Sequence, residues 1–450
     1  MKASRARSLA RQVVSRVRER DAYAHETLDA MLKRSELEPR DTAFATRLAY
    51  GTISARGTLD EIVAARLTPG TNLQPVVKDC LAVSAYEILF LSTPKRAAVN
   101  EGVELVRAVQ ERAAGLANAV LRRIAESAAD FPWGDPSTDI VALARLHAHP
   151  LWLAQSWVDE YGHDVAASMM AANNEPAPLF LATPVDAASI TAALQDEGVV
   201  VAPCALPGCL VAEDPSAAIK STTVADRRAF VMDAGAQFAV HAVPLAPDSD
   251  VIEVGAGRGS KTLLIAARAA AAGLKVSVLA VDTHSHKLDT LRSDAARLGL
   301  NGITTLVADA TKPDQNTWPA PGGADVVLVD APCSGLGTLR RHPDRRWRAI
   351  PAEIESLAAL GTRLLQSAVS LVKPGGFVVY STCTVARREN HDVVASFLAS
   401  EVGSDFTTDP LNDTVPGEWS HFITPEGWFQ AIPAAGGPDG HFVARLRRRD

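Results

Sequence analysis

The chain has 450 residues, of which 47% are hydrophobic and 22% are charged, and its formal net charge is −7. These values are typical of a soluble globular protein with two or three domains, and they exclude a uniformly basic nucleic-acid-binding protein. Arg268 and Lys275 interrupt the most apolar stretch, so the sequence predicts no membrane-spanning helix and no membrane partner.

The distribution of charge and the cysteine content further limit the class of protein and the compartment in which it works. The first 60 residues carry 12 Lys and Arg against 8 Asp and Glu, with no acid before Glu19. An organelle transit peptide is one interpretation of this start, but its apolar positions continue the helical pattern that follows, which favours a folded helix. The five cysteines are scattered without paired spacing, which predicts free thiols in a reducing compartment, here the cytoplasm.

Hydrophobic periodicity predicts three parts along the chain. Residues 1–130 place apolar residues at spacings of three and four and predict an all-α bundle. A stretch rich in Pro, Gly and Asp follows at residues 129–139 and marks a boundary. Residues 140–225 predict a small α+β domain. From residue 226 to 450, β-branched runs alternate with helices, which predicts a doubly wound α/β domain with a mostly parallel sheet.

The first strand-to-helix turn of the third part reads "EVGAGRGSK", from Glu253 to Lys261. Glycines at this place let a strand turn sharply and let a ligand approach the backbone, and the spacing fits a nucleoside-type ligand. A packing turn without a ligand is the alternative. Asp282, Asp309 and Asp330 end or follow the next three strands. Each could cap a helix, but together they favour a ligand site at the carboxyl edge of the sheet.

Two of the five cysteines also follow predicted strands. Cys333 stands in "VDAPCSGLG" and Cys383 in "YSTCT", so a doubly wound sheet should bring both to one crevice. A thiolate suits attack on an electron-poor ring carbon. Buried hydrophobic cysteines, or a metal or redox pair, are the alternatives. No further cysteine or clustered histidine supplies metal ligands, so we predict no metal.

The segment from Arg340 to Arg348, "RRHPDRRWR", contains five arginines and one aspartate. It is suited to phosphate and base contacts, and a solvated basic turn is the alternative. The predicted RNA-binding residues are Arg340, Arg341, Arg345, Arg346 and Trp347.

These motifs together resemble the RsmB (Sun/Fmu) group of small-subunit rRNA cytosine-5 methyltransferases, within the NOL1/NOP2/Sun family. "DAPCSGLGTLRRHPDRRW", "KPGGFVVYSTCTV" and "DGHFVARL" carry the resemblance most specifically, and "RDTAFATRLAYGTISARGTLD" and "GLANAVLRRIAE" resemble the NusB-type RNA-binding domain of that group. The resemblance covers almost the whole chain. It implies an all-α NusB-like domain, a small α+β middle domain and a Rossmann-like class I methyltransferase domain.

The resemblance also implies the cofactor and the roles of residues. S-adenosylmethionine would lie on the glycine turn, with Asp282 at its ribose, Asp309 at its adenine amine and Asp330 near its methionine end. The expected cofactor-binding residues are Glu253, Gly255, Ala256, Gly257, Arg258, Gly259, Lys261, Asp282, Lys287, Asp309 and Asp330. The expected catalytic residues are Cys383 as nucleophile, Cys333 as the helper in its release, Asp330 and Lys261.

The expected activity is therefore transfer of a methyl group to carbon 5 of a cytosine in 16S rRNA through a covalent cysteine adduct, by a monomer. The chain departs from the family in "GAGRGSK", which lacks a proline and holds Arg258, in "MDAGAQF" and in "LFLATPV". Three rival hypotheses stay open, of which the first follows from the altered glycine turn. The chain could be a scaffold that no longer binds cofactor, the same enzyme acting on transfer RNA, or a dinucleotide oxidoreductase, although an oxidoreductase would not need the two cysteines.

Overall fold

The computed structural model describes residues 3–20, 24–183, 186–313, 318 and 323–450. By its internal contacts the chain divides into two compact units. The first unit consists of Met1–Pro176 and Leu339–Ala349, and the second of Ala177–Thr338 and Ile350–Asp450.

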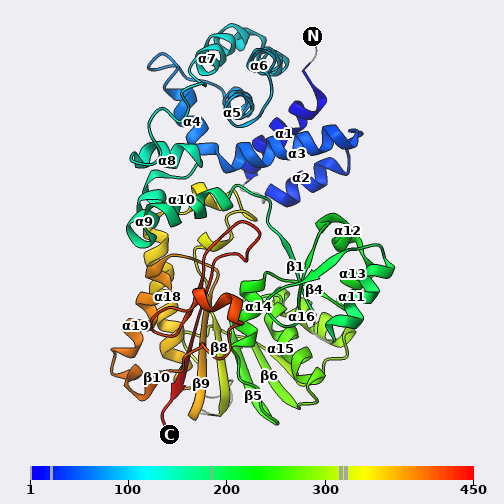
Figure 1. The fold of residues 1–450 in the computed structure, drawn as a ribbon, viewed down its shortest axis with the longest axis vertical. Helices are drawn as coiled ribbons and strands as arrows, with labels where there is room; N and C mark the ends of the chain where they lie inside the picture. The colour runs from blue at the N-terminus through cyan, green and yellow to red at the C-terminus, as the bar shows by residue number, and fades with distance from the viewer. Residues whose placement is uncertain (1–2, 21–23, 184–185, 314–317, 319–322) are drawn as a thin grey trace. The chain divides into compact units, whose positions relative to one another are not determined.

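The first unit begins with the predicted helical bundle. Its helices are α1 (Arg5–Arg20), α2 (Ala24–Leu32), α3 (Pro39–Ser54), α4 (Arg56–Ala64), α5 (Pro75–Phe90), α6 (Lys95–Val109) and α7 (Ala114–Glu126). Helix α5 is apolar around most of its circumference, and ten of its sixteen residues are buried. A helix that is hydrophobic on all sides belongs in a core, so α5 is the centre around which the amphipathic helices pack (Figure 1).

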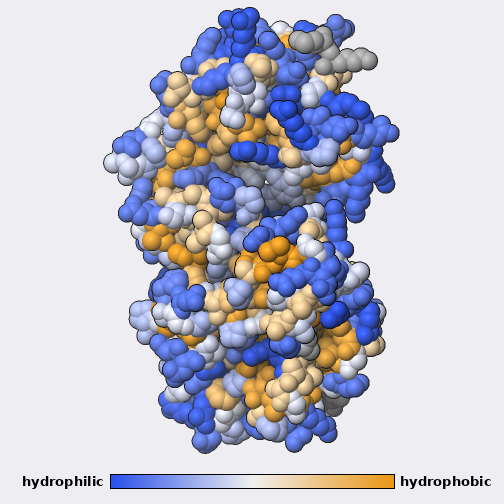
Figure 2. All heavy atoms as spheres, turned by 45° about the vertical axis from the view of Figure 1, so that its right-hand side comes forward, coloured by the Kyte–Doolittle hydropathy of each residue, from blue (hydrophilic) through white to orange (hydrophobic). Residues whose placement is uncertain are grey.

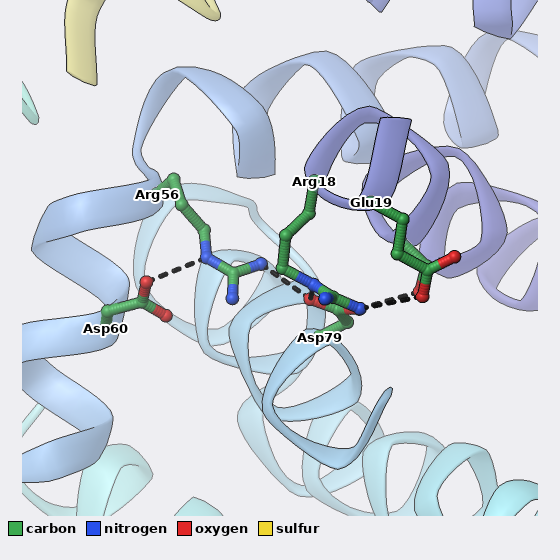
Figure 3. A network of polar contacts seen from close by, with 6 residues as sticks. Arg18, Glu19, Arg56, Asp60 and Asp79 are labelled. Carbon is green, nitrogen blue, oxygen red and sulfur yellow. Dashed lines mark hydrogen bonds and ion pairs between the residues drawn. The ribbon is translucent and has the colours of Figure 1, made fainter. Parts of the chain in front are cut away.

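One buried carboxylate fixes helices of this bundle to each other. Asp79 on α5 has no exposed surface, and its oxygens accept hydrogen bonds from Ser15 Oγ at 2.7 Å, Arg18 Nη2 at 2.9 Å and Arg56 Nη1 at 2.8 Å (Figure 3). Burial raises the pKa of Asp79, but these hydrogen bonds outweigh burial and lower the pKa below its usual value. The ionised Asp79 therefore ties α1 and α4 to α5.

Three further helices and one short segment complete the first unit. The helices are α8 (Ile140–Leu146), α9 (Leu151–Tyr161) and α10 (His163–Ala172). The segment Leu339–Ala349 contains the single-turn helix α17 (Arg345–Arg348) and groups with this unit by its contacts, although the chain on either side belongs to the second unit.

The second unit begins with a small antiparallel sheet in the order β2-β3-β1-β4. Its elements are β1 (Leu179–Ala182), α11 (Ala187–Asp196), β2 (Val201–Pro203), β3 (Cys209–Ala212), α12 (Pro215–Lys220), α13 (Thr222–Ala225) and β4 (Phe230–Val231). The predicted domain 140–225 thus has its first helices in one unit and its strands in the other. We keep the three boundaries predicted from the sequence as a proposal.

The main sheet has the order β10-β12-β9-β8-β5-β6-β7, with β11 paired to β12. Its strands are β5 (Ser249–Val254), β6 (Val276–Asp282), β7 (Ile303–Val307), β8 (Ala324–Asp330), β9 (Val372–Thr382), β10 (Phe406–Thr408), β11 (Phe429–Ala431) and β12 (His441–Arg448). Strands β5 to β9 pair in parallel, and β12 pairs with β9 in the antiparallel direction. The strand order reverses between β5 and β8, where open α/β sheets bind ligands.

Helices cover both faces of this sheet (Figure 1). They are α14 (Ala234–His241), α15 (Ser260–Ala271), α16 (Ser285–Arg297), α18 (Pro351–Ala368) and α19 (His391–Leu398). Along β8, Val326 and Leu328 pack with α14, α15 and α16, whereas Val327 and Val329 pack with α18 and α19. This alternation follows from the two-residue period of a strand. The predicted Rossmann-like domain is confirmed.

On the face drawn in Figure 2, hydrophobic patches are broken up by hydrophilic residues. Among the residues that the structure describes, no helix is both long and apolar enough to cross a membrane.

Candidate active site

The glycine turn lies between β5 and α15, at the point where the strand order reverses. Gly255 has a φ of +82°, and a Cβ built on it would meet the carbonyl oxygen of Asp330 at 2.3 Å. Only glycine therefore allows the end of β5 to lie this close to the end of β8. Gly257 also has a positive φ, +56°, and its N–H donates to Asp282 Oδ2 at 2.9 Å. The turn therefore presents backbone atoms that no side chain of Gly255 or Gly257 covers.

Asp282 lies at the end of β6, as predicted. Besides Gly257, the N–H of His284 donates to its Oδ1 at 2.8 Å. Burial raises the pKa of Asp282, but the hydrogen bonds from His284 and Gly257, together with the charge of Lys287, outweigh burial and lower it. The side chain is thus an ionised acceptor beside the glycine turn, which suits a ribose hydroxyl.

The other predicted cofactor residues differ in their exposure. Asp309 follows β7, and Thr311 donates to its Oδ1 from both N–H and Oγ1; these bonds lower the pKa of Asp309. Arg258 is exposed and Ala256 is buried. Glu253 is 1% exposed, accepts a hydrogen bond from Thr262 Oγ1, and has a pKa raised by burial to about 7. Glu253 is therefore a buried residue that fixes the first turn of α15 through its hydrogen bond with Thr262.

Lys261 and Asp330 form an ion pair beside the turn. The Lys261 Nζ donates to Asp330 Oδ2 at 2.6 Å, and the Lys261 side chain is 13% exposed. Burial lowers the pKa of Lys261, but the charge and hydrogen bond of Asp330 outweigh burial and raise it. The pair therefore places a fixed cation and a partly exposed carboxylate at the end of β8.

The two predicted cysteines meet at the same edge of the sheet. Cys333 and Cys383 follow the neighbouring parallel strands β8 and β9, and their Sγ atoms are 3.4 Å apart. The hydrogen bond between the two thiols lowers the pKa of Cys383, against burial and the charge of Asp330, and the charge of Lys261 lowers it further. The same hydrogen bond, together with burial, raises the pKa of Cys333. Cys383 is therefore the thiol of the pair that ionises more readily.

A residue that the sequence analysis missed holds the two cysteine loops together. The carboxylate of Glu389 is 1% exposed and accepts from the Ser334 N–H at 2.7 Å, from Ser334 Oγ at 2.5 Å and from Thr384 Oγ1 at 3.0 Å. Ser334 follows Cys333 and Thr384 follows Cys383. Burial raises the pKa of Glu389, and these hydrogen bonds oppose the increase. No local pattern reveals this role, because Ser334 lies 55 positions away.

Asn390 supports the loop of Cys383 from the same short segment. Its Oδ1 accepts from Thr382 Oγ1 at 2.6 Å, and its Nδ2 donates to the Thr384 carbonyl at 2.9 Å. The residues on both sides of Cys383 are thus bound by buried polar side chains. Such satisfied networks keep a reactive group in one position.

The arginine-rich segment does not lie as predicted. The guanidinium of Arg346 has no exposed surface and donates to Ala148 O at 3.1 Å, Asn173 O at 3.0 Å and Asn174 Oδ1 at 2.8 Å. Burial lowers the pKa of Arg346 to about 9. Trp347 Nε1 donates to Ser54 O at 2.7 Å. These contacts anchor the segment within the first unit. The fully buried Arg346 is therefore corrected from an RNA contact to a structural residue, whereas the partly exposed Trp347 stays a predicted RNA contact.

The remaining arginines of the segment differ in exposure. Arg340 is buried, whereas Arg341 and Arg345 are partly exposed. Among the described residues, no group of three or more His, Cys, Asp and Glu side chains is placed to hold a metal ion.

Three family models match the chain in sequence. The model described as 16S rRNA methyltransferase RsmB/F matches residues 241–447, the NusB family model matches residues 4–126, and a Methyltr_RsmF/B-like, ferredoxin-like domain matches residues 149–218. The first match contains the glycine turn, the Lys261–Asp330 pair and both cysteine loops.

Relatives match over the full length. A protein of Mycobacterium tuberculosis named as a methyltransferase is 35% identical over 98% of this chain and 96% of its own. The ribosomal RNA small subunit methyltransferase B of Thermus thermophilus is 32% identical over 100% of this chain and 99% of its own. Among solved structures, PH0851 has a TM-score of 0.77 at 22% identity, with 100% of both chains covered. NSun6 from Pyrococcus horikoshii, solved with SFG, has a TM-score of 0.57 at 17% identity over 68% of this chain and 100% of its own.

Proposed function

Because this chain belongs to the RsmB/F family of 16S rRNA methyltransferases, we propose that it methylates carbon 5 of a cytosine in small-subunit rRNA through a covalent cysteine adduct. The observation that carries this proposal is the pair of thiols 3.4 Å apart, of which Cys383 has the lowered pKa. A methyltransferase that acted on a stronger nucleophile would need neither cysteine.

The glycine turn fits S-adenosylmethionine as the methyl donor. The turn offers a surface without side chains at Gly255 and Gly257, and the ionised Asp282 beside it can accept hydrogen bonds from ribose hydroxyls. Asp309 would accept from the adenine amine, and Lys287 adds positive charge near Asp282. When bound, S-adenosylmethionine supplies an electrophilic methyl group on a positively charged sulfur.

The thiols perform the chemistry on the base. Carbon 5 of cytosine is too weak a nucleophile to accept a methyl group directly. Addition of the Cys383 sulfur to carbon 6 forms a carbon–sulfur bond and moves ring electrons onto carbon 5. After methylation, loss of the carbon 5 proton and breakage of the carbon–sulfur bond restore the ring. Cys333, whose raised pKa keeps it protonated, assists the release of Cys383.

The Lys261–Asp330 ion pair affects the charges of the thiolate and of the bound cytosine during the reaction. Asp330 is partly exposed at the end of β8, where its carboxylate can accept a hydrogen bond from the amino group of the bound cytosine. The Lys261 cation beside it can stabilise the negative charge that develops on the ring when the thiolate adds. Lys261 holds Asp330 in place and stabilises the Cys383 thiolate. The pair therefore links the activation of the nucleophile to the activation of the base.

The reaction needs access to carbons 5 and 6 of one base, so the target must be unstacked from its neighbours. Arg341, Arg345 and Trp347 remain the proposed RNA contacts of the arginine-rich segment. The NusB-type helices support ribosomal over transfer RNA as the substrate. We further propose that the protein acts as a monomer in the cytoplasm.

A denaturing gel tests the proposal. Wild type, Cys383→Ala, Cys333→Ala and the control Cys204→Ala are incubated with S-adenosylmethionine and unmethylated small-subunit rRNA. We expect a protein–RNA band that survives denaturation only for Cys333→Ala, because its adduct forms but is not released. Methylation without any adduct in Cys333→Ala would overturn the assigned roles. Calorimetry with S-adenosylmethionine then separates a wrong RNA substrate from a protein that binds no cofactor.

A further inference from the structure

A second pair of cysteines lies outside the proposed active site, in the small sheet of the second unit. Strands β2 and β3 form a hairpin in which Pro203 is opposite Leu210, so Cys204 and Cys209 are the next opposed residues. The Cys204 N–H donates to Cys209 O at 2.8 Å. Residues 205–208 close the hairpin, and the Cys209 N–H donates to Leu206 O at 3.0 Å.

Opposed positions of an antiparallel hairpin suit a disulfide. Directly opposite residues have Cα atoms about 4.5–5.5 Å apart and side chains on the same face of the sheet. Disulfides span Cα distances of about 4.4–6.8 Å. The two sulfurs can therefore bond without a large change of the backbone.

The two thiols differ in reactivity and access. The hydrogen bond from Cys209 lowers the pKa of Cys204 to about 6, and the N–H groups of Leu206 and Ala205 in the turn lower it as well, against burial and the charge of Asp233. The interaction with the Cys204 thiol, together with burial, raises the pKa of Cys209. Cys204 is partly exposed, whereas Cys209 is 2% exposed. An accessible thiolate thus lies beside a buried thiol.

We propose that Cys204 and Cys209 form a peroxide-sensitive dithiol that closes to a reversible disulfide across the β2–β3 hairpin. The Cys204 sulfur attacks one oxygen of hydrogen peroxide; a sulfur–oxygen bond forms, the oxygen–oxygen bond breaks and hydroxide leaves, giving a sulfenic acid. The Cys209 sulfur then gives its proton to that hydroxide and attacks the Cys204 sulfur. The sulfur–sulfur bond forms and the sulfenic oxygen leaves as water once protonated. Two thiols are oxidised, and one peroxide is reduced to two waters.

The other cysteines provide the contrast that a test needs. Cys80 has no exposed surface, and burial raises its pKa to about 12, so it serves as an unreactive internal reference. Cys333 and Cys383 are also close enough to oxidise together, so they are replaced by serine in a full-length variant. The remaining thiols in that variant are Cys80, Cys204 and Cys209.

The experiment treats this full-length variant, and the wild type, with hydrogen peroxide. The protein is then denatured and alkylated with N-ethylmaleimide, and the tryptic peptide after Arg145 that ends at Lys220 is weighed; it contains both cysteines, with no Lys or Arg between its ends. We expect this peptide to lose two hydrogens and take up no maleimide, with reversal by dithiothreitol, while the Cys80 peptide is alkylated in full. Alkylation of both Cys204 and Cys209 after peroxide treatment would overturn the proposal.

Single variants test the order of events without relying on activity. In Cys209→Ser, Cys204 should stop at the sulfenic acid and react with dimedone. In Cys204→Ser, Cys209 should stay reduced, with peroxide oxidation slowed at least about 10-fold relative to Cys204 in Cys209→Ser, because its thiolate is scarce. Equal oxidation of Cys209 with and without Cys204 would refute the assignment of Cys204 as the attacking thiol.

Discussion

The second unit contains two cysteine pairs. In both pairs the pKa of one thiol is lowered by its partner, but the residues around the two pairs differ. Cys333 lowers the pKa of Cys383, and Cys209 lowers that of Cys204. Cys204 and Cys209 lie five positions apart in one hairpin. Cys333 and Cys383 lie 50 positions apart and meet because β8 and β9 are neighbours.

The surroundings decide what each thiolate can do. Near Cys383 the cation Lys261 favours a thiolate, whereas the charges of Asp330 and Glu389 oppose it. Asp330 is also partly exposed, so a base can reach its carboxylate. The charged group that acts on both hairpin thiols is Asp233, an acid that disfavours a thiolate. A lowered pKa alone therefore does not identify a catalytic cysteine. The proposed catalytic pair is the one built among groups that also handle the charge of a substrate.

Replacement of Cys383 or Cys204 by alanine should give the largest difference between the two pairs in methylation activity. We expect Cys383→Ala to lower methylation by at least about 10⁴-fold, because the covalent step loses its nucleophile. Cys204→Ala should stay within about 2-fold of wild type, since Cys204 lies outside the site. Incorporation of a labelled methyl group into unmethylated small-subunit rRNA measures both. A comparable loss in the two variants would mean that the hairpin pair also serves methylation.

The ion pair beside Cys383 should have the next largest effect. Lys261→Met removes the cation from a partly buried carboxylate and from the thiolate, so we expect kcat to fall about 10²-fold, the usual scale for one charge-stabilising group. Lys373→Met is the matched control, because Lys373 pairs with Asp325 elsewhere in the same sheet. Steady-state methylation rates should be unchanged in the control. Equal losses would point to stability rather than charge.

The sequence predicted those parts of the site that depend on strand ends. Asp282, Asp330, Cys333 and Cys383 each end or follow an apolar run, and the carboxyl ends of parallel strands meet at one edge. The prediction that the two cysteines lie together at one edge of the sheet is confirmed by their 3.4 Å separation. The roles of the two thiols came from the family resemblance, because spacing does not tell which cysteine has a lowered pKa.

The rest of the site depends on contacts between distant positions. The carboxylate of Glu389 reaches Ser334, and Arg346 is enclosed by carbonyl oxygens of residues near 148 and 173. A basic run in a sequence reads as a nucleic-acid surface, but whether carbonyl groups converge on one arginine is a property of the folded chain. The opposition of Cys204 and Cys209 likewise becomes visible only once the hairpin register is known.

The hydrogen bonds that hold the Cys333 and Cys383 loops in place should have a smaller effect on the methylation rate. Glu389→Gln keeps the shape but weakens three hydrogen bonds to the cysteine loops, so we expect kcat to fall about 10-fold with little change in KM. Glu389→Asp should recover part of the rate, and the exposed Glu355→Gln, whose partner is Arg388, is the control. Peroxide closure of the Cys204–Cys209 pair should be unaffected, because backbone hydrogen bonds set that geometry. Loss of both functions would indicate global unfolding instead.

The smallest expected effect is a shift in the pH at which each thiolate forms. Iodoacetamide labelling of single peptides against pH should give a midpoint at about 6 for Cys204 and a midpoint lowered from the ordinary value of a thiol for Cys383. Labelling rises with pH because the thiolate is the reactive form, so a lowered pKa moves the midpoint down. In Lys261→Met the Cys383 midpoint should move up, because a favourable cation is lost, while the Cys204 midpoint stays. If neither midpoint moves, the hydrogen bond between Cys333 and Cys383 alone sets the thiolate, and Lys261 acts on Asp330 only.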